Sequence, residues 1–248
     1  MYEPRIYRDG MNLDRFSDFR VVAGETDLWI GIDKWSSGRF DPVKVENFVV
    51  SLREQLVEYI DRYPDFLNSM KPVPVIQGDP VFAIRLKKAA KLSGTGPMAG
   101  IAGYIAEEVA RFIIMETDPT ELIVENGGDI CMKIAQPLNL ALETVSNPAF
   151  SNIGLEISPG TDLMGVCSSS GMFGHSFSYG KADLVMVLAS PSELADTWAT
   201  ALANQIGKEE DIDGIMEKIP RDIQACVAIK GSKISLKGRL RLVKLKQG

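Results

Sequence analysis

Cysteines are few in this sequence, and their arrangement excludes two kinds of cross-link. The chain of 248 residues contains three, Cys131, Cys167 and Cys226, which are far apart, odd in number and without CxxC spacing. Such a pattern predicts neither a disulfide framework nor a zinc site. It suits a protein of a reducing compartment.

Long apolar runs are also missing. No stretch is continuously hydrophobic over the length that a membrane helix needs. The N-terminal MYEPRIYRDG has neither the apolar core of a signal peptide nor a lipid-anchoring cysteine. We therefore expect a cytoplasmic protein with no membrane partner.

An excess of positive charge is absent too. Asp and Glu number 33 against 27 Lys and Arg, a formal net charge of -6, and no lysine run is interleaved with aromatics. This balance predicts no nucleic-acid partner. One basic cluster, Lys87, Lys88 and Lys91, is interpreted as the solvated face of a helix. The alternation in KGRLRLVKLKQG, residues 237–248, is typical of an edge strand protected by lysines.

What is present is the composition of an ordinary globular protein. Hydrophobic residues make up 45% of the chain and charged residues 24%, and the length allows a sizeable core. No internal repeat and no linker rich in Pro or Gly divides the sequence. We therefore expect one compact domain over residues 1–248.

Hydrophobic periodicity predicts helices and strands in blocks. Asp41-Pro42 and Asp79-Pro80 each have the pattern of a cap with proline at the first helical position, and they open helices that reach about residues 63 and 92. A third helix, around 102–113, has small residues on one face, which predicts close packing. Strands joined at residues 24–25 are expected over 19–33, and others at 121–126, 127–134, 138–145, 151–158, 163–170, 181–189, 225–230, 233–237 and 239–245, with helices at 192–205 and within 209–219. Blocks of this kind predict an α+β architecture rather than a doubly wound parallel sheet.

Two glycine-rich segments are candidate ligand sites. In SGTGPMAGIAG, residues 93–103, the spacing fits a dinucleotide fingerprint, but a lysine-rich helix precedes it where the fingerprint needs a strand. The segment is either an anion site at a helix N-terminus or a helix start that needs glycines for packing. Asn126-Gly127 is a strong hairpin signal, and Gly128 with Asp129 would let a ligand approach the backbone beside a carboxylate. A simple turn is the other interpretation.

The segment MGVCSSSGMFGHSFSYG, residues 164–180, contains His175, the only histidine of the chain. A hydrolase using Ser168, Ser169 or Ser170 with His175 is the weakest interpretation, because no Gly-x-Ser-x-Gly elbow and no acidic partner accompany them. A loop that contacts a polar ligand, or a merely solvated loop, are the alternatives.

A carboxylate and a hydroxyl lie one turn apart in SELADTWATALANQ, residues 192–205. Asp196 and Thr200 are four residues apart, so they point the same way on a helix. They are either a cap or a ligand pair, and capping suits Ser192 better. A buried aspartate between alanines needs a partner, and Mg²⁺ prefers oxygen ligands of this kind.

Three of these segments together resemble the ApbE-like superfamily, flavin transferases that attach FMN from FAD to a threonine of a target protein. Residues 195–202, ADTWATAL, resemble its Ala-Asp-x-x-Ala-Thr-Ala-Leu signature. Residues 100–104, GIAGY, are similar to its Gly-Ile-Ala-Lys-Gly-Tyr helix start, and residues 126–129 to its Asn-x-Gly-Gly-Asp turn. The opening strands with GETDLWI look like those of a cytoplasmic prokaryotic branch.

The resemblance implies an ApbE-like layered fold with mixed or antiparallel sheets and packed helices, and it implies Mg²⁺ and FAD as ligands. Asp196 and Thr200 match the metal ligands of the family, with a backbone carbonyl near Ala102 as a third. Catalytic roles are expected for Asp129 and His175. The residues expected to bind the cofactor are Gly100, Ala102, Gly103, Asn126, Gly127, Gly128, Ser169 and Ser170.

Two departures from the family leave alternatives open. The lysine between Ala102 and Gly103 is missing, and residues 174–180 replace a His-x-x-x-Asp-Pro-x-x-Gly segment. The leading hypothesis is a magnesium-dependent enzyme that acts on FAD or a related nucleotide pyrophosphate, transferring FMN to an acceptor, such as a protein, or hydrolysing the bond. The alternative is a non-catalytic flavin- or nucleotide-binding protein. Association into a homo-oligomer through a long helix stays open.

Overall fold

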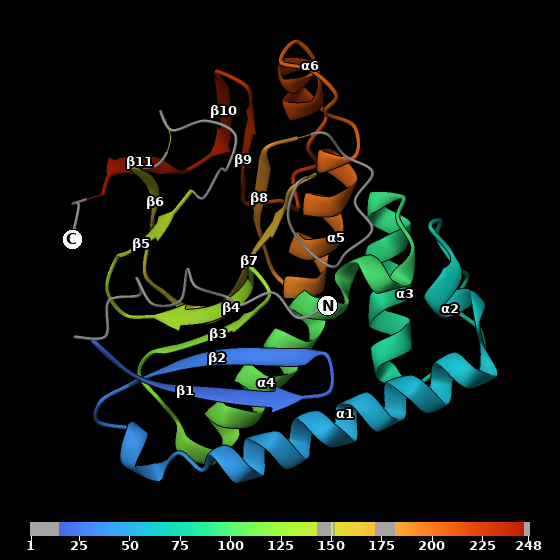
Figure 1. Ribbon diagram of the computed structural model, residues 1–248, viewed down its shortest axis with the longest axis vertical. Coiled ribbons are helices and arrows are strands. Elements are labelled where there is room, and N and C mark those ends of the chain that lie inside the picture. The colour runs from blue at the N-terminus through green and yellow to red at the C-terminus, as the bar shows by residue number, and fades with distance from the viewer. Residues whose placement is uncertain (1–14, 143–149, 151, 172–181, 246–248) are drawn as a thin grey trace.

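Two antiparallel sheets carry the fold, in a computed structural model that describes residues 15–142, 150, 152–171 and 182–245. The larger sheet has eight strands in the order β1-β2-β3-β4-β7-β8-β9-β10, and the smaller has the order β11-β6-β5 (Figure 1). The strands are β1 (Phe16–Ala23), β2 (Thr26–Asp33), β3 (Leu122–Asn126), β4 (Asp129–Ile134), β5 (Leu138–Ala141), β6 (Ile153–Ile157), β7 (Gly160–Ser169), β8 (Leu184–Ala189), β9 (Ala225–Lys230), β10 (Lys233–Gly238) and β11 (Arg241–Lys244).

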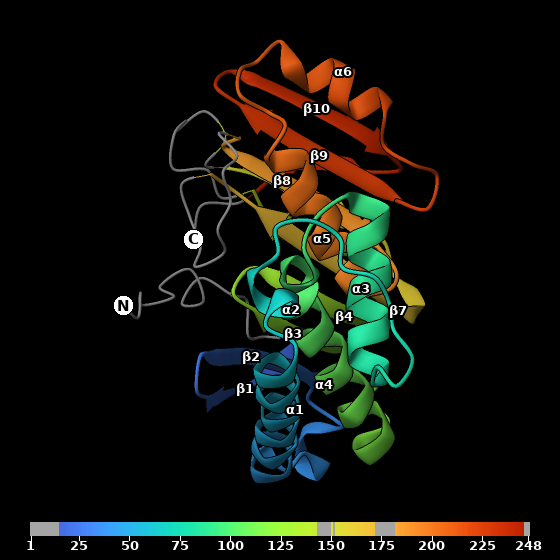
Figure 2. The same ribbon diagram turned by 90° about the vertical axis from the view of Figure 1, so that its right-hand side faces the viewer.

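The helices cover one face of the larger sheet. They are α1 (Pro42–Arg62), α2 (Asp65–Asn68), α3 (Val81–Ser93), α4 (Ile101–Thr117), α5 (Ser192–Ala203) and α6 (Asp211–Glu217), with 3-10 turns η2 (Ser37–Arg39) and η3 (Pro97–Gly100). Figure 2 shows these helices in front of the strands. Helices and antiparallel sheets in separate layers confirm the predicted α+β architecture. Among the described residues, no helix has both the length and the apolar character to cross a membrane.

The two faces of the larger sheet serve different layers. On β8, Val185 and Val187 pack in the cluster with α5, whereas Met186 and Leu188 pack against the smaller sheet. Successive side chains of a strand point to opposite faces, so a strand covered on both sides needs apolar residues at every position. This explains the unbroken apolar run at 184–189.

Local signals at helix and strand ends are mostly confirmed. The Asp41 carboxylate accepts from the backbone N–H groups of Val43 (3.0 Å) and Lys44 (3.4 Å), so it caps α1 as predicted. Among the strands of the described residues, β11 pairs with β6 alone, which makes it an edge strand, as the C-terminal pattern predicts.

The prediction for Asp79 and the lysine cluster is partly wrong. Pro80, not Asp79, is the N-cap residue of α3, and no side chain caps this helix. The Asp79 carboxylate instead accepts from Tyr59 Oη (2.5 Å) and Lys87 Nζ (2.7 Å). Lys87 is buried because α3 turns this face towards α1, while Lys88 stays exposed. Hydrophobic periodicity alone did not show that the face of α3 carrying Lys87 is buried.

Replacing Asp79 by alanine tests this buried contact. The change leaves the Lys87 ammonium without its carboxylate, and we expect the free energy of unfolding to fall by about 3 kcal/mol. Lys88→Ala, on the exposed side of the same helix, is the matched control and should change it by less than about 0.5 kcal/mol. Urea denaturation measures both, and equal losses would contradict the assignment.

Candidate functional site

Four segments that are far apart in the chain meet at one place. They are the start of α4, the turn between β3 and β4, the end of β7, and α5. The backbone N–H of Gly103 donates to Asp196 Oδ2 (2.9 Å), and Asn126 Nδ2 donates to the carbonyl oxygen of Ala102 (3.2 Å). The N–H of Ser168 donates to Asp129 Oδ1 (3.2 Å). The structure thus unites the three segments whose sequences resemble the superfamily signatures.

The absence of a side chain at Gly103 lets α4 touch α5. A Cβ atom there would lie 2.6 Å from the carbonyl oxygen of Ser192 and 3.0 Å from Asp196 Cβ. Gly100 is similarly constrained, because its Cβ would lie 2.9 Å from the carbonyl oxygen of Glu193. The close packing predicted for this helix is confirmed, and it accounts for these two glycines without any ligand.

The β3–β4 connection is a two-residue hairpin turn. Gly127 and Gly128 are its central residues, with φ of 69° and 96°, and Asn126 pairs with Asp129. Both central residues therefore adopt the left-handed region that glycine favours. The Ser168 hydroxyl donates to the carbonyl oxygen of Gly128 (3.1 Å), which ties this turn to β7. The hairpin prediction is confirmed.

The site contains two buried carboxylates, Asp129 and Asp196, close enough for the charge of Asp196 to act on Asp129. Burial is the main cause that raises the pKa of Asp196 to about 7, and the N–H groups of Gly103 and Ala102 only partly oppose it. Burial, followed by the charge of Asp196, raises the pKa of Asp129 well above its ordinary value. Shifts of this kind mark positions where a cation or a ligand is the natural partner.

The oxygen atoms of the site suit a hard cation. No group of three or more His, Cys, Asp and Glu side chains in the described part of the chain has the arrangement of a metal site. The candidate donors are of mixed type: the Asp196 carboxylate, the hydroxyl of the half-buried Thr200 one turn later, and the Ala102 carbonyl, which also accepts from Asn126 Nδ2. These donors fit Mg²⁺, which keeps waters or phosphate oxygens in its other positions.

The serine segment is only partly described. Ser169 is the last residue of β7, where it pairs with Val185, and Ser170 follows it directly at the same end of the sheet as Asp129. His175 lies outside the described residues. The hydrolase alternative and the catalytic role of His175 therefore stay predictions.

A group of charged residues beside the site was missed by the sequence analysis. Glu107 and Glu193 are 0% and 2% exposed, and the Arg85 side chain reaches both of them. The available signal was the position of Glu107, one turn after Gly103 on a helix with an apolar face. An acidic residue at such a position needs a buried partner.

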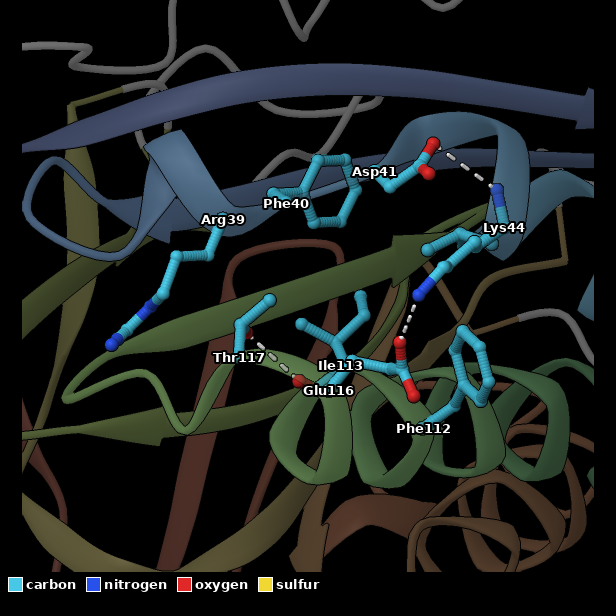
Figure 3. Close-up of a pocket in the computed structure, with 9 residues that line it drawn as sticks. Arg39, Phe40, Asp41, Lys44, Phe112, Ile113, Glu116 and Thr117 are labelled. Carbon is cyan, nitrogen blue, oxygen red and sulfur yellow. Dashed lines mark hydrogen bonds and ion pairs between the residues drawn. The ribbon is translucent and has the colours of Figure 1, made fainter.

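A surface hollow lies at the other end of α4. Arg39, Phe40, Lys44, Phe112 and Glu116 are among its lining residues, and Figure 3 shows the Lys44–Glu116 ion pair (2.7 Å) across it. Along the helix, Gly103 and Glu116 are separated by about 20 Å. The hollow is therefore separate from the candidate site.

Relatives of this chain were found by sequence. A family model described as AbpE bacteria matches residues 8–224. A UPF0280 protein of Methanopyrus kandleri is 36% identical over 239 residues, which cover 92% of this chain and 94% of the relative. A UPF0280 protein of Methanothermobacter thermautotrophicus is 33% identical over 202 residues, with 82% and 75% covered.

Solved structures share the fold at low sequence identity. The flavinyl transferase ApbE of Pseudomonas stutzeri has a TM-score of 0.59 and 14% identity, and the match covers 92% of this chain and 96% of that chain. The apbE protein of Thermotoga maritima has a TM-score of 0.53 and 14% identity, with 93% and 97% covered. This likeness confirms the ApbE-like layered fold that the sequence motifs imply.

The buried carboxylate of Asp196 predicts a pH dependence of stability. Between its ordinary pKa and about 7, the folded protein holds a proton that the unfolded chain releases, so the free energy of unfolding falls as pH rises through this range. We expect urea denaturation without divalent cations to give lower stability at pH 8 than at pH 5.5. Asp196→Asn should make this decline shallower, and an unchanged slope would contradict the shift.

Gly103→Ala tests the close approach of α4 and α5. The new methyl group meets backbone atoms that cannot move aside, so the free energy of unfolding should fall by about 1–3 kcal/mol despite the better helix propensity of alanine. Gly160→Ala, where nothing lies within 4 Å of the added Cβ, is the control and should be nearly neutral. Chemical denaturation of both variants measures the difference.

Proposed function

This chain belongs to the protein family described as AbpE bacteria, and from this premise we propose that it is a magnesium-dependent enzyme acting on FAD or a related nucleotide pyrophosphate. It would transfer the FMN moiety to an acceptor or hydrolyse the pyrophosphate. The observation that carries the proposal is the pair of buried carboxylates, Asp129 and Asp196, beside the Ala102 carbonyl and Thr200.

Each side of the site has a separate task in this proposal. Asp196 and Thr200 of α5, with the carbonyl oxygen of Ala102, would hold Mg²⁺. The bound cation would neutralise charge on the pyrophosphate. The Gly127-Gly128 turn has no side chains, so a flat or charged ligand would approach its backbone closely. Ser169 and Ser170 would contact the same nucleotide from the end of β7.

The proposed substrate comes from the relatives. Solved structures with this fold are described as a flavinyl transferase ApbE in Pseudomonas stutzeri and a flavin transferase ApbE in Vibrio cholerae. A transferase of this kind needs an acceptor, and we propose a cytoplasmic acceptor protein. Asp129, whose pKa is raised well above its ordinary value by burial and by the charge of Asp196, is the described group that we propose for proton transfer at the acceptor.

A non-catalytic flavin- or nucleotide-binding protein is the second candidate. It is favoured by the missing lysine: Gly103 follows Ala102 directly, whereas the superfamily signature has a lysine between these two positions. The same cradle would then hold the ligand without breaking the pyrophosphate bond. This candidate predicts tight binding and no product.

The deciding experiment incubates the protein with FAD, with and without MgCl₂, and follows AMP and FMN by chromatography. We expect cation-dependent release of AMP, reduced about 100-fold or more in Asp196→Asn, which removes the negative charge of the ligand, and about tenfold in Thr200→Val, which removes the hydroxyl oxygen. Glu116→Gln, at the far end of α4, is the control and should keep full activity.

Flavin fluorescence, recorded in parallel, separates the remaining outcomes. Binding of FAD without AMP release supports the binding protein, provided that adding candidate acceptor proteins produces no flavin-labelled product. No binding, or AMP release that is independent of both the cation and Asp196, would contradict the proposed function.

A further inference from the structure

Glu107 connects the site helix α4 to the first residue of α5. Its carboxylate is fully buried, and Oε2 accepts the backbone N–H of Ser192 at 2.6 Å. The N-cap of α5 is Pro191, which provides no side-chain cap. The first amides of a helix need acceptors, so Glu107 supplies from another helix what the local sequence of α5 lacks.

Two arginines keep this carboxylate charged. Arg111 Nη2 donates to Glu107 Oε1 (2.7 Å), and Arg85 Nη2 donates to the same oxygen (3.1 Å). Burial alone would raise the pKa of Glu107, but the Ser192 N–H and Arg111 hold it below its ordinary value. A charged acceptor makes a stronger bond to the helix amide than a neutral one.

Arg85 also fixes the first turn of α5 directly. Its Nε and Nη2 atoms donate to the two carboxylate oxygens of Glu193, at 2.7 and 2.8 Å, and Nη1 donates to Glu108 Oε1 at 2.5 Å. Bidentate contact restricts orientation as well as distance. One side chain of α3 therefore holds both α4 and α5.

Two of the hydrogen bonds between α4 and α5 lie one helical turn apart. Gly103 contacts Asp196, and Glu107 contacts Ser192. On α4 the second residue follows the first by four positions, and on α5 it precedes it by four, so the two contacts are neighbouring links between antiparallel helices. The Glu107–Ser192 hydrogen bond therefore fixes how far α5 is shifted along α4, and so where Asp196 contacts the start of α4.

We propose that Glu107, held by Arg85, is a positioning residue that keeps Asp196 against the Gly103 amide. It thereby shapes the oxygen cluster of the site, which consists of the Asp196 carboxylate, the Thr200 hydroxyl and the Ala102 carbonyl. Its effect on cation binding rests on the proposed function, whereas its effect on the Gly103–Asp196 contact does not. Arg85 and Glu107 both lie outside the sequence segments that resemble the superfamily signatures. Glu107 follows the helix-start segment, residues 100–104, by three positions.

Amide hydrogen exchange, read by NMR on the full chain without added metal, tests the positioning itself. In Glu107→Ala we expect the Gly103 amide to exchange about tenfold faster or more, because its acceptor moves away. Glu107→Gln keeps an oxygen for Ser192 and should restore the rate to within about threefold of the original protein. Glu116→Ala removes a carboxylate from the same helix, in an exposed pair with Lys44, and should leave Gly103 unchanged (Figure 3).

Calorimetric titration with MgCl₂ tests the consequence for the site. We expect the dissociation constant to rise about 10-fold or more in Glu107→Ala and to stay near the original value in Glu107→Gln and Glu116→Ala. If the unsubstituted protein binds no Mg²⁺, the proposed function fails, and the exchange experiment still decides the positioning role.

Some results would overturn the inference. An unchanged Gly103 rate in Glu107→Ala, or an equal acceleration of every amide in α4 and α5, would show that Glu107 has no specific hold on this contact. Should Glu107→Ala fail to fold, Arg85→Gln takes its place, with faster exchange expected at Gly103 and Ser192 and not at the far end of α4. Unchanged rates at both amides in that variant would also count against the proposal.

Discussion

The contact between the first turn of α4 and the first turns of α5 is the constraint on which the candidate site depends. It requires a residue without a side chain at Gly103, because a Cβ there would stand 2.6 Å from the carbonyl oxygen of Ser192. The same approach brings the Gly103 amide to Asp196 and leaves the Ala102 carbonyl beside Asn126. One glycine thus allows both helix packing and the assembly of the oxygen cluster.

Buried carboxylates near this contact fall into two groups. Glu107 has a lowered pKa because arginines and a helix amide satisfy it, and it acts within the architecture. Asp196 and Asp129 have raised pKa values because burial, with the charge of neighbouring carboxylates, outweighs their N–H donors. The imbalance, rather than burial itself, distinguishes a place prepared for a ligand from a satisfied structural network.

Periodicity and turn residues were sufficient for the strands and the longer helices, but not for the short helix α2 or for the environment of every side chain. The cap at Asp41 and the hairpin at Gly127-Gly128 are local, since the groups that decide them lie within a few residues. Asp79 has the same local pattern as Asp41, yet its carboxylate binds Tyr59 of α1 and Lys87, which lies two turns along α3. A tertiary partner overrode a local preference, and no local pattern carries that information.

The sequence by itself determined the order of the elements, the α+β layering and the motifs that carry the superfamily resemblance, because hydrophobic period, capping and turn chemistry act between near neighbours. Only the tertiary structure decided which of the acidic residues share an environment. Gly103 and Asp196 are 93 positions apart, and Arg85 and Glu193 are 108 apart. Helix packing on the sheet brings such pairs together, and the pKa values of Asp129 and Asp196 are raised only after that packing excludes water.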